Sequence, residues 1–347
     1  MLFKTQNPHG GDIYGGQVEL DFSANTNPFG TPEGVKNAVI QALASVHRYP
    51  DPYCRKLISA ISEFEQVPEE YILCGNGAAE LIYAYSQAIA PKTAAELAPT
   101  FSEYALGLKR VGCIPEKYLL DPENGFILTE DFLDFLQKKQ PQAVFLCNPN
   151  NPTGQLLDFR LLHKILKFTR ERSIYLFVDE CFLDLSQGGE SLKGYLQENP
   201  QLLILKAFTK SYGMAGIRLG YCLSANPETL SAMAAATQPW NVSSLAQAAG
   251  IAALQEKAFP EKTRELIFRE RPRMQRALED LGFRVIDSAA NYLLFQGPVG
   301  LDQKLKEKKI AIRSCSNYVG LGDGWYRAAV RLPEENRLLL AAIKDCL

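Results

Sequence analysis

From about residue 70 onward, short uninterrupted apolar runs alternate with longer segments whose apolar residues recur at helical spacing. The run at 71–75 is followed by segment 78–90, whose apolar side chains fall on one helical face, and Pro91 ends it. Apolar runs without polar alternation are typical of strands buried on both faces. The pattern therefore predicts an α/β fold, with a mostly parallel mixed sheet covered by helices. Further strands of this kind are expected at 143–147, 174–179 and 202–208.

The pattern changes after about residue 250. A long helical region at 245–281 precedes four short strand-like runs, at 283–288, 291–297, 309–314 and 327–332. This order is typical of a smaller α+β domain, and a chain of 347 residues exceeds the size of one ordinary core. We expect an arm at 1–30 that packs on the small domain, a large domain at 31–250 and the small domain at 251–347.

Composition narrows the function classes. A net charge of −2 gives no electrostatic reason to expect nucleic acid or an anionic membrane as a partner. No apolar run reaches the roughly 18 residues that span a bilayer, and the N-terminus lacks a signal-peptide core, so we expect a cytoplasmic protein. The eight cysteines form no CxxC pair and indicate buried free thiols. The three histidines are too dispersed to predict a metal site.

The glycine-rich, asparagine-rich and charged segments follow the predicted strands. In α/β proteins ligands bind at this edge of the sheet. The turn GNGAAE at 75–80 opens a helix, which fits either a phosphate site or a simple tight turn. The turn NPNNPTG at 148–154 presents the amide of Asn151. Asp179 ends an apolar strand, where a carboxylate needs a donor or a cation.

Lys210 follows another buried strand. A buried lysine is costly unless it forms an ion pair, here with Asp179, or unless its amine is used for Schiff-base chemistry. Thr209, Ser211 and Arg218 surround Lys210 with groups that bind anions. A cofactor that carries both an aldehyde and a phosphate accounts for all of them, and pyridoxal 5′-phosphate (PLP) is such a cofactor.

Together, the order GNG…PTFSEY…NPNNPTG…DE…TK…R…R resembles the fold-type-I PLP enzymes of the aspartate aminotransferase superfamily, closest to the histidinol-phosphate aminotransferase branch. The resemblance runs from about Asp21 to Arg331. It implies that Lys210 binds the cofactor aldehyde, that Asp179 pairs with the pyridine nitrogen, and that Asn151 donates to the ring hydroxyl. It further implies that Phe101 stacks on the ring, with Tyr104 as second choice.

The same resemblance implies a phosphate site and a homodimer. The groups implied to hold the phosphate are the amides of Gly77, Ala78 and Ala79, with Thr209, Arg218 and Tyr49. Tyr49 would come from a neighbouring subunit, so that two chains share each active site.

Both ends of the chain narrow the resemblance further. HGGDIYG at 9–15 and YRAAVRLPEEN near the C-terminus resemble the branch that decarboxylates L-threonine O-3-phosphate in cobalamin biosynthesis. Phe182 stands where aminotransferases usually have tyrosine, which agrees with that branch. The resemblance implies a substrate carboxylate on Arg327 and a substrate phosphate on further residues. These are Arg313 and Arg331, helped by His9 and Asn25.

Several alternatives remain open at this point. A histidinol-phosphate aminotransferase would share the fold, the cofactor and nearly every residue above, and an O-phosphoserine decarboxylase would differ by one substrate methyl. A non-catalytic binding module would not need Lys210, Asp179, Asn151 and Arg218. A nicotinamide-dependent oxidoreductase would need a glycine fingerprint that the chain lacks.

Overall fold

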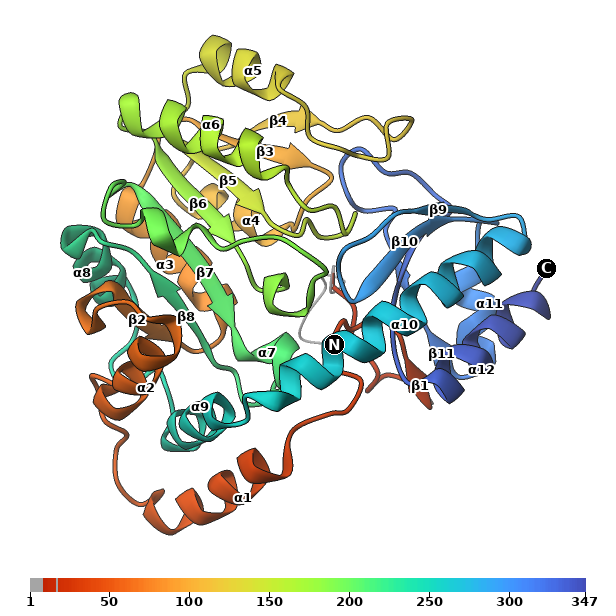
Figure 1. Ribbon diagram of the computed structural model, residues 1–347, viewed down its shortest axis with the longest axis horizontal. Helices are drawn as coiled ribbons and strands as arrows, with labels where there is room; N and C mark the ends of the chain where they lie inside the picture. The colour runs from red at the N-terminus through yellow and green to blue at the C-terminus, as the bar shows by residue number, and fades with distance from the viewer. Residues whose placement is uncertain (1–8, 17) are drawn as a thin grey trace.

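The computed structural model describes residues 9–16 and 18–347. Within these residues the large domain contains a seven-stranded sheet of order β2-β8-β7-β6-β5-β3-β4 (Figure 1). β8 runs antiparallel to both of its neighbours, β2 and β7, and the other strand pairs in this sheet are parallel. The sheet is therefore mixed and mostly parallel, as predicted. The strands are β2 (Ile72–Gly75), β3 (Ala94–Ala98), β4 (Glu116–Leu119), β5 (Ala143–Cys147), β6 (Tyr175–Asp179), β7 (Leu202–Ala207) and β8 (Gly220–Leu223).

Helices cover both faces of this sheet, because successive strand residues point to opposite sides. In β5, Val144 and Leu146 join one core and Phe145 joins the other. One face is covered by α3 (Ala78–Ile89), α4 (Glu103–Arg110) and α8 (Pro227–Ala236). The other is covered by α2 (Arg55–Glu65), α5 (Asp131–Lys139), α6 (Phe159–Glu171) and α9 (Ser244–Gln255), with α1 (Glu33–Ala42) packed on α9.

The small domain has a four-stranded antiparallel sheet of order β12-β13-β10-β9 in the described part of the chain. The N-terminal strand β1 pairs in parallel with β11, which joins the start of the chain to this domain. The elements are β1 (Leu20–Asp21), β9 (Arg284–Ile286), β10 (Tyr292–Gln296), β11 (Ile310–Ala311), β12 (Arg313–Ser314), β13 (Trp325–Ala329), α11 (Leu301–Glu307) and α12 (Pro333–Lys344).

The connection between the domains lies later than expected. The predicted boundary after residue 250 falls inside α9, whose apolar face packs on α1 and α2 of the large domain. The long helix α10 (Ala258–Asp280) begins beside the short helix α7 (Phe208–Ser211) and ends against the small-domain strands (Figure 1). The domains therefore meet along α10.

Two further predictions concern the cysteines and membranes. All eight cysteines are buried free thiols, as predicted. Of the helices in the described residues, none is both long and apolar enough to cross a membrane.

Candidate active site

A cavity of about 150 Å³ lies at the carboxyl ends of β5, β6 and β7. Its walls come from segments far apart in the sequence, which the parallel strand order brings to one edge of the sheet. Eight of the residues predicted to bind a cofactor line it. They are Ala78, Ala79, Phe101, Asn151, Asp179, Thr209, Lys210 and Arg218.

Lys210 lies in α7, immediately after β7, and is half-buried. Among the described residues, none forms a hydrogen bond or ion pair with its amine, which lies 5.3 Å from the centre of the Phe182 ring. Burial is the main cause that lowers the pKa of Lys210 to about 8, and the charges of Arg327 and Arg218 add to it. At pH 7 about a tenth of this amine is therefore uncharged, far more than for an ordinary lysine, and the uncharged form can attack a carbonyl carbon.

Asp179 ends β6 and is buried. Its carboxylate accepts hydrogen bonds from the Cys181 N–H, at 2.9 Å, and from the Tyr104 hydroxyl, at 2.6 Å. Burial raises the pKa of Asp179, and the two donors act in the opposite direction. The carboxylate would be stabilised by a cation in the cavity, such as a protonated pyridine nitrogen.

Tyr104 was predicted as second choice, after Phe101, to stack on the cofactor ring. Its contact with Asp179 places it elsewhere. Tyr104 is fully buried and is not among the cavity-lining residues. Its ring meets the half-buried Phe101 edge-on, with centroids 5.7 Å apart, and Phe101 itself lines the cavity. Phe101 is thus placed to cover a ring in the cavity, and Tyr104 acts on Asp179.

The amino end of α3 forms an anion cradle beside this cavity. Gly77 caps the helix with a φ of +81°, and no side chain caps the first N–H groups. A Cβ atom at Gly77 would lie 2.6 Å from a guanidinium nitrogen of Arg218. Arg218 donates to the Ala215 carbonyl at 3.3 Å and has no carboxylate partner in the described part of the chain. A helix terminus with an adjacent free arginine suits a phosphate.

Arg327 reaches the cavity residues from the small domain. Its guanidinium donates to the Asn151 side-chain oxygen and, at 2.9 Å, to the Ser23 carbonyl. Arg327 is only 6% exposed, yet within the described ranges it has no carboxylate partner. Because a buried cation without a counter-ion is costly, this geometry indicates a site for an anionic ligand group. With its oxygen engaged by Arg327, Asn151 presents its amide N–H₂ as a donor.

This geometry agrees with the comparison with known proteins. Residues 18–343 match the family described as aminotransferase class I and II. The chain belongs to this family. It is 37% identical to threonine-phosphate decarboxylase of Salmonella typhimurium, over 94% of this chain and 91% of that protein. It is 36% identical to histidinol-phosphate aminotransferase of Desulfitobacterium hafniense, over 95% of this chain and 92% of the relative.

The comparison with solved structures agrees with this family. The structure of histidinol-phosphate aminotransferase from Clostridium acetobutylicum superposes with a TM-score of 0.88, at 29% identity, over 94% of this chain and 98% of that one. The predicted fold class, a fold-type-I PLP enzyme with a large and a smaller domain, is therefore confirmed.

PLP is the cofactor of this family, and the cavity residues fit it. A free lysine amine suits its aldehyde, the buried Asp179 suits its ring nitrogen, and the cradle at Gly77 and Arg218 suits its phosphate. The Asn151 amide is a donor that suits its ring hydroxyl. The four groups lie around one cavity, so a single ligand can satisfy all of them.

The other two predicted substrate arginines differ from each other. Arg313 on β12 is paired in register with Arg327 on β13, and it donates to Asn317 at 2.7 Å. Arg331 lies beyond the end of β13, which stops at Ala329, and it forms an ion pair of 2.9 Å with Glu335. The strand predicted at 327–332 therefore ends earlier than expected, and Arg327 and Arg331 do not lie on one strand.

Two N-terminal residues predicted to bind the substrate also have defined positions. Asn25 is 2% exposed, and within the described part of the chain neither polar atom of its side chain has a hydrogen-bond partner. A buried amide without partners indicates a place where a ligand is expected. The Nε2 atom of His9 lies 2.6 Å from Glu103, and its ring centroid lies 5.6 Å from that of Phe101. His9 therefore borders the aromatic wall of the cavity.

Tyr49 lies outside the cavity of its own chain. Its side chain is 78% exposed and stacks on Trp240 with centroids 4.6 Å apart. A contribution of Tyr49 to a phosphate site thus requires a second chain.

Tyr292 is a site residue that the sequence analysis missed. It is fully buried, donates its hydroxyl to the Asn150 carbonyl at 2.9 Å, and its ring lies 5.4 Å from the Arg327 guanidinium carbon. It also packs edge-on against Phe182. The only sequence signal was a tyrosine inside an apolar strand, since a buried hydroxyl usually needs a partner.

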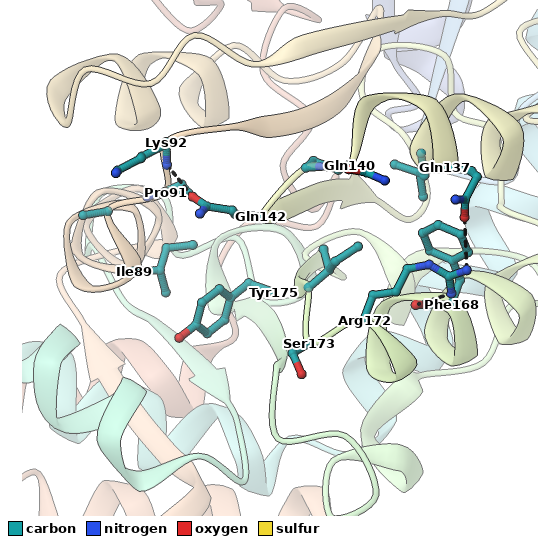
Figure 2. A pocket seen from close by; sticks show the side chains of 14 residues that line it. Ile89, Pro91, Lys92, Gln137, Gln140, Gln142, Phe168, Arg172, Ser173 and Tyr175 are labelled. Atoms are coloured by element: carbon teal, nitrogen blue, oxygen red, sulfur yellow. Dashed lines mark hydrogen bonds between the residues drawn. The ribbon is translucent and has the colours of Figure 1, made fainter.

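A larger cavity of about 580 Å³ lies elsewhere, where helices α3, α5 and α6 end (Figure 2). Gln142 accepts from the Lys92 N–H at 2.7 Å, and Arg172 donates to Gln137 at 3.0 Å. Its lining residues include none of the predicted site residues. Size alone therefore does not identify the active site.

Proposed function

We propose that this protein catalyses the PLP-dependent decarboxylation of L-threonine O-3-phosphate to (R)-1-aminopropan-2-ol O-2-phosphate, a reaction of cobalamin biosynthesis. Support comes from the similarity to the Salmonella protein named threonine-phosphate decarboxylase, which covers nearly the whole chain. Because a histidinol-phosphate aminotransferase is almost as similar, overall identity does not decide between the two reactions.

The observation that carries the proposal is the pair of arginines on neighbouring strands. Arg327 is buried without a carboxylate partner among the described residues, and Arg313 is its register partner. A substrate with a carboxylate and a phosphate fits two adjacent cations. We assign the carboxylate to Arg327 and the phosphate to Arg313, with Asn25 and His9 as further donors.

Orientation then decides which substrate bond breaks. When bound, PLP supplies an aldehyde for the substrate amine and a ring that accepts electrons. If Arg313 and Arg327 held the phosphate and the carboxylate separately, they would restrict rotation about the substrate N–Cα bond and so would select the bond to the carboxylate for cleavage. Asp179 would keep the ring nitrogen protonated, and the Lys210 amine would deliver to Cα the proton that replaces the departing carbon dioxide.

Phe182 favours the decarboxylase over the aminotransferase. Its ring packs against Tyr292 and lies 5.3 Å from the Lys210 amine, so residue 182 offers no hydroxyl beside that amine. Aminotransferases of this superfamily usually have a tyrosine there.

A substrate panel tests the proposal. The purified enzyme is incubated in parallel with O-phosphothreonine, O-phosphoserine and histidinol phosphate, each with and without 2-oxoglutarate. We expect carbon dioxide from O-phosphothreonine without any keto acid. Stoichiometric amine transfer to 2-oxoglutarate would reject the proposal in favour of the aminotransferase, and faster turnover of O-phosphoserine would change the substrate. The visible absorbance band of the cofactor-loaded protein should vanish in Lys210→Ala.

We also propose a homodimer with shared active sites. Exposed apolar side chains cluster in the segment that carries Tyr49, together with Trp240; they are Ile40, Leu43, Val46 and Tyr53. Several exposed apolar side chains within one segment are typical of a subunit interface. All eight cysteines are free thiols, which fits a reducing compartment such as the cytoplasm.

Mixing two inactive variants tests the shared site. Lys210→Ala and Tyr49→Ala chains are unfolded together and refolded at equal amounts. If each site combines Lys210 of one chain with Tyr49 of the other, mixed dimers contain one intact site, and about a quarter of wild-type activity returns. No gain over the separate variants, or a monomer in sedimentation, would contradict the shared site.

A further inference from the structure

The position of the Lys210 amine depends on the turn that carries it, since no described residue hydrogen-bonds the amine itself. That turn is α7, a helix of only four residues. The last carbonyls of a helix lack intrahelical donors. At Ser211, directly after Lys210, the carbonyl accepts a hydrogen bond of 2.8 Å from the side chain of Asn27.

Asn27 is held in one orientation. It is 3% exposed, and its amide nitrogen donates both to Ser211 and, at 2.8 Å, to the hydroxyl of Thr263 in α10. Its amide oxygen accepts the Phe29 N–H at 2.9 Å. Both polar atoms of the Asn27 side chain are therefore hydrogen-bonded, and rotating the amide would break three hydrogen bonds at once.

The rest of this N-terminal segment packs on the chain after Lys210. The Thr31 hydroxyl donates to the Gly213 carbonyl at 2.8 Å. Gly213 has a φ of +60°, and a Cβ atom there would lie 2.3 Å from the Gly30 carbonyl oxygen. Residues 27–31 therefore lie in close contact with residues 211–213.

The opposite side of α7 is held by a charged cluster that also contacts α10. The Ser211 hydroxyl lies 3.4 Å from a carboxylate oxygen of Asp184, which forms an ion pair of 3.1 Å with Lys206. The Asp184 carbonyl accepts from Arg264 at 3.1 Å. Thr263 and Arg264 are neighbours in α10. Thr263 contacts Asn27 and Arg264 contacts Asp184, so α10 contacts both residues that hold the Lys210 turn.

We propose that Asn27 is a positioning residue that fixes the Lys210 turn against α10, the helix along which the two domains meet (Figure 1). The inference rests on the proposed function only in taking Lys210 as the cofactor lysine. Asn27 is not among the residues that line the cavity. It acts through Ser211, and it links the amine to the arrangement of the domains.

The test uses the full-length protein without cofactor or substrate. Acetic anhydride labels uncharged amines, and peptide mapping of Lys210 over a pH series gives its titration midpoint. The charged groups around this amine are Asp179, Arg218 and Arg327, and Cys181 adds a thiol. In Asn27→Ala we expect the turn to loosen and the amine to hydrate, so that labelling at pH 8 falls about three- to tenfold and labelling at pH 11 does not change.

A matched control separates positioning from simple destabilisation. Asn199 is also a buried asparagine in a turn, where its side chain accepts a hydrogen bond from the Gln201 N–H. It precedes β7, whereas Lys210 follows the opposite end of that strand. Asn199→Ala should lower the melting temperature without moving the Lys210 midpoint. With cofactor and substrate, Asn27→Ala should lower kcat about tenfold and change KM by less than about threefold.

A second variant covers a failure of Asn27→Ala to fold. Thr263→Val removes the contact of Asn27 with α10, together with the bond from the Thr263 hydroxyl to the Phe259 carbonyl, and keeps the side-chain shape. It should move the midpoint in the same direction by a smaller amount. A wild-type Lys210 midpoint in both the Asn27 and Thr263 variants would overturn the proposal. Because labelling needs no substrate, a failure of decarboxylation in the substrate panel leaves this result unaffected.

Discussion

Arg313 and Arg327 are register partners in the antiparallel pair of β12 and β13. Side chains of such partners lie on the same face of a sheet, with Cβ atoms about 4.5–5.5 Å apart. Like-charged residues directly opposite each other destabilise a sheet, and anionic groups bound between them relieve that repulsion. The small-domain sheet thus brings two cations together beside a cavity built by the large domain.

Arg313 and Arg331 should respond differently to alanine. Because Arg331 is already paired with Glu335, Arg331→Ala should mainly lower the melting temperature. Arg313→Ala should raise the KM for O-phosphothreonine about ten- to hundredfold, the effect of one charge-assisted hydrogen bond. Steady-state kinetics and thermal unfolding of both variants measure this, and a larger KM effect at Arg331 would reverse the assignment.

Gly77→Ala should weaken cofactor binding through a steric clash. The new Cβ atom would lie 2.6 Å from Arg218, which must move away from the phosphate cradle. Gly282→Ala is the matched control, since Gly282 has a similar φ of +87° and open space around a Cβ. We expect the Kd for PLP to rise about tenfold or more in the Gly77 variant alone. Equal Kd values in a fluorescence titration would refute the clash.

Tyr104→Phe should act through Asp179. The variant removes one of two donors to the carboxylate, so the pKa of Asp179, already raised by burial, rises further. As the pH falls, the ionised Asp179 carboxylate is then lost at a higher pH than in wild type. The acidic limb of the pH profile of kcat/KM should therefore shift to higher pH. Tyr85→Phe is the control, because the buried Tyr85 hydroxyl has no hydrogen-bond partner among the residues that the structure describes. A shared pH profile for both variants would rule out this role.

Lys210 should destabilise the apoenzyme at neutral pH. Its pKa is about 8 when folded and about 10.5 when unfolded, so between these values the unfolded chain binds more protons and stability rises with pH. Below pH 8 both states are charged, and the penalty of a buried ammonium is complete. Lys210→Met should therefore be more stable than wild type by about 1–2 kcal/mol at pH 7. That margin should shrink toward pH 10 in urea unfolding, and a constant margin would contradict the lowered pKa.

The sequence by itself predicted the α/β fold and most of the cofactor site. Uninterrupted apolar runs identified the buried strands, and the residues after them were certain to share one edge because parallel strands end together. Lys210, Asp179 and Asn151 could therefore be assigned without coordinates. Each stands directly after such a run or within a few residues of it.

Only the tertiary structure decided which distant side chains meet. Tyr104 reaches Asp179, and Asn27 reaches Ser211, because strand order and domain packing bring together residues that no local periodicity relates. Likewise, β13 ends at Ala329, which separates the roles of Arg327 and Arg331. A local pattern reports which face of an element is buried, whereas a hydrogen-bond partner depends on the register and position of another element.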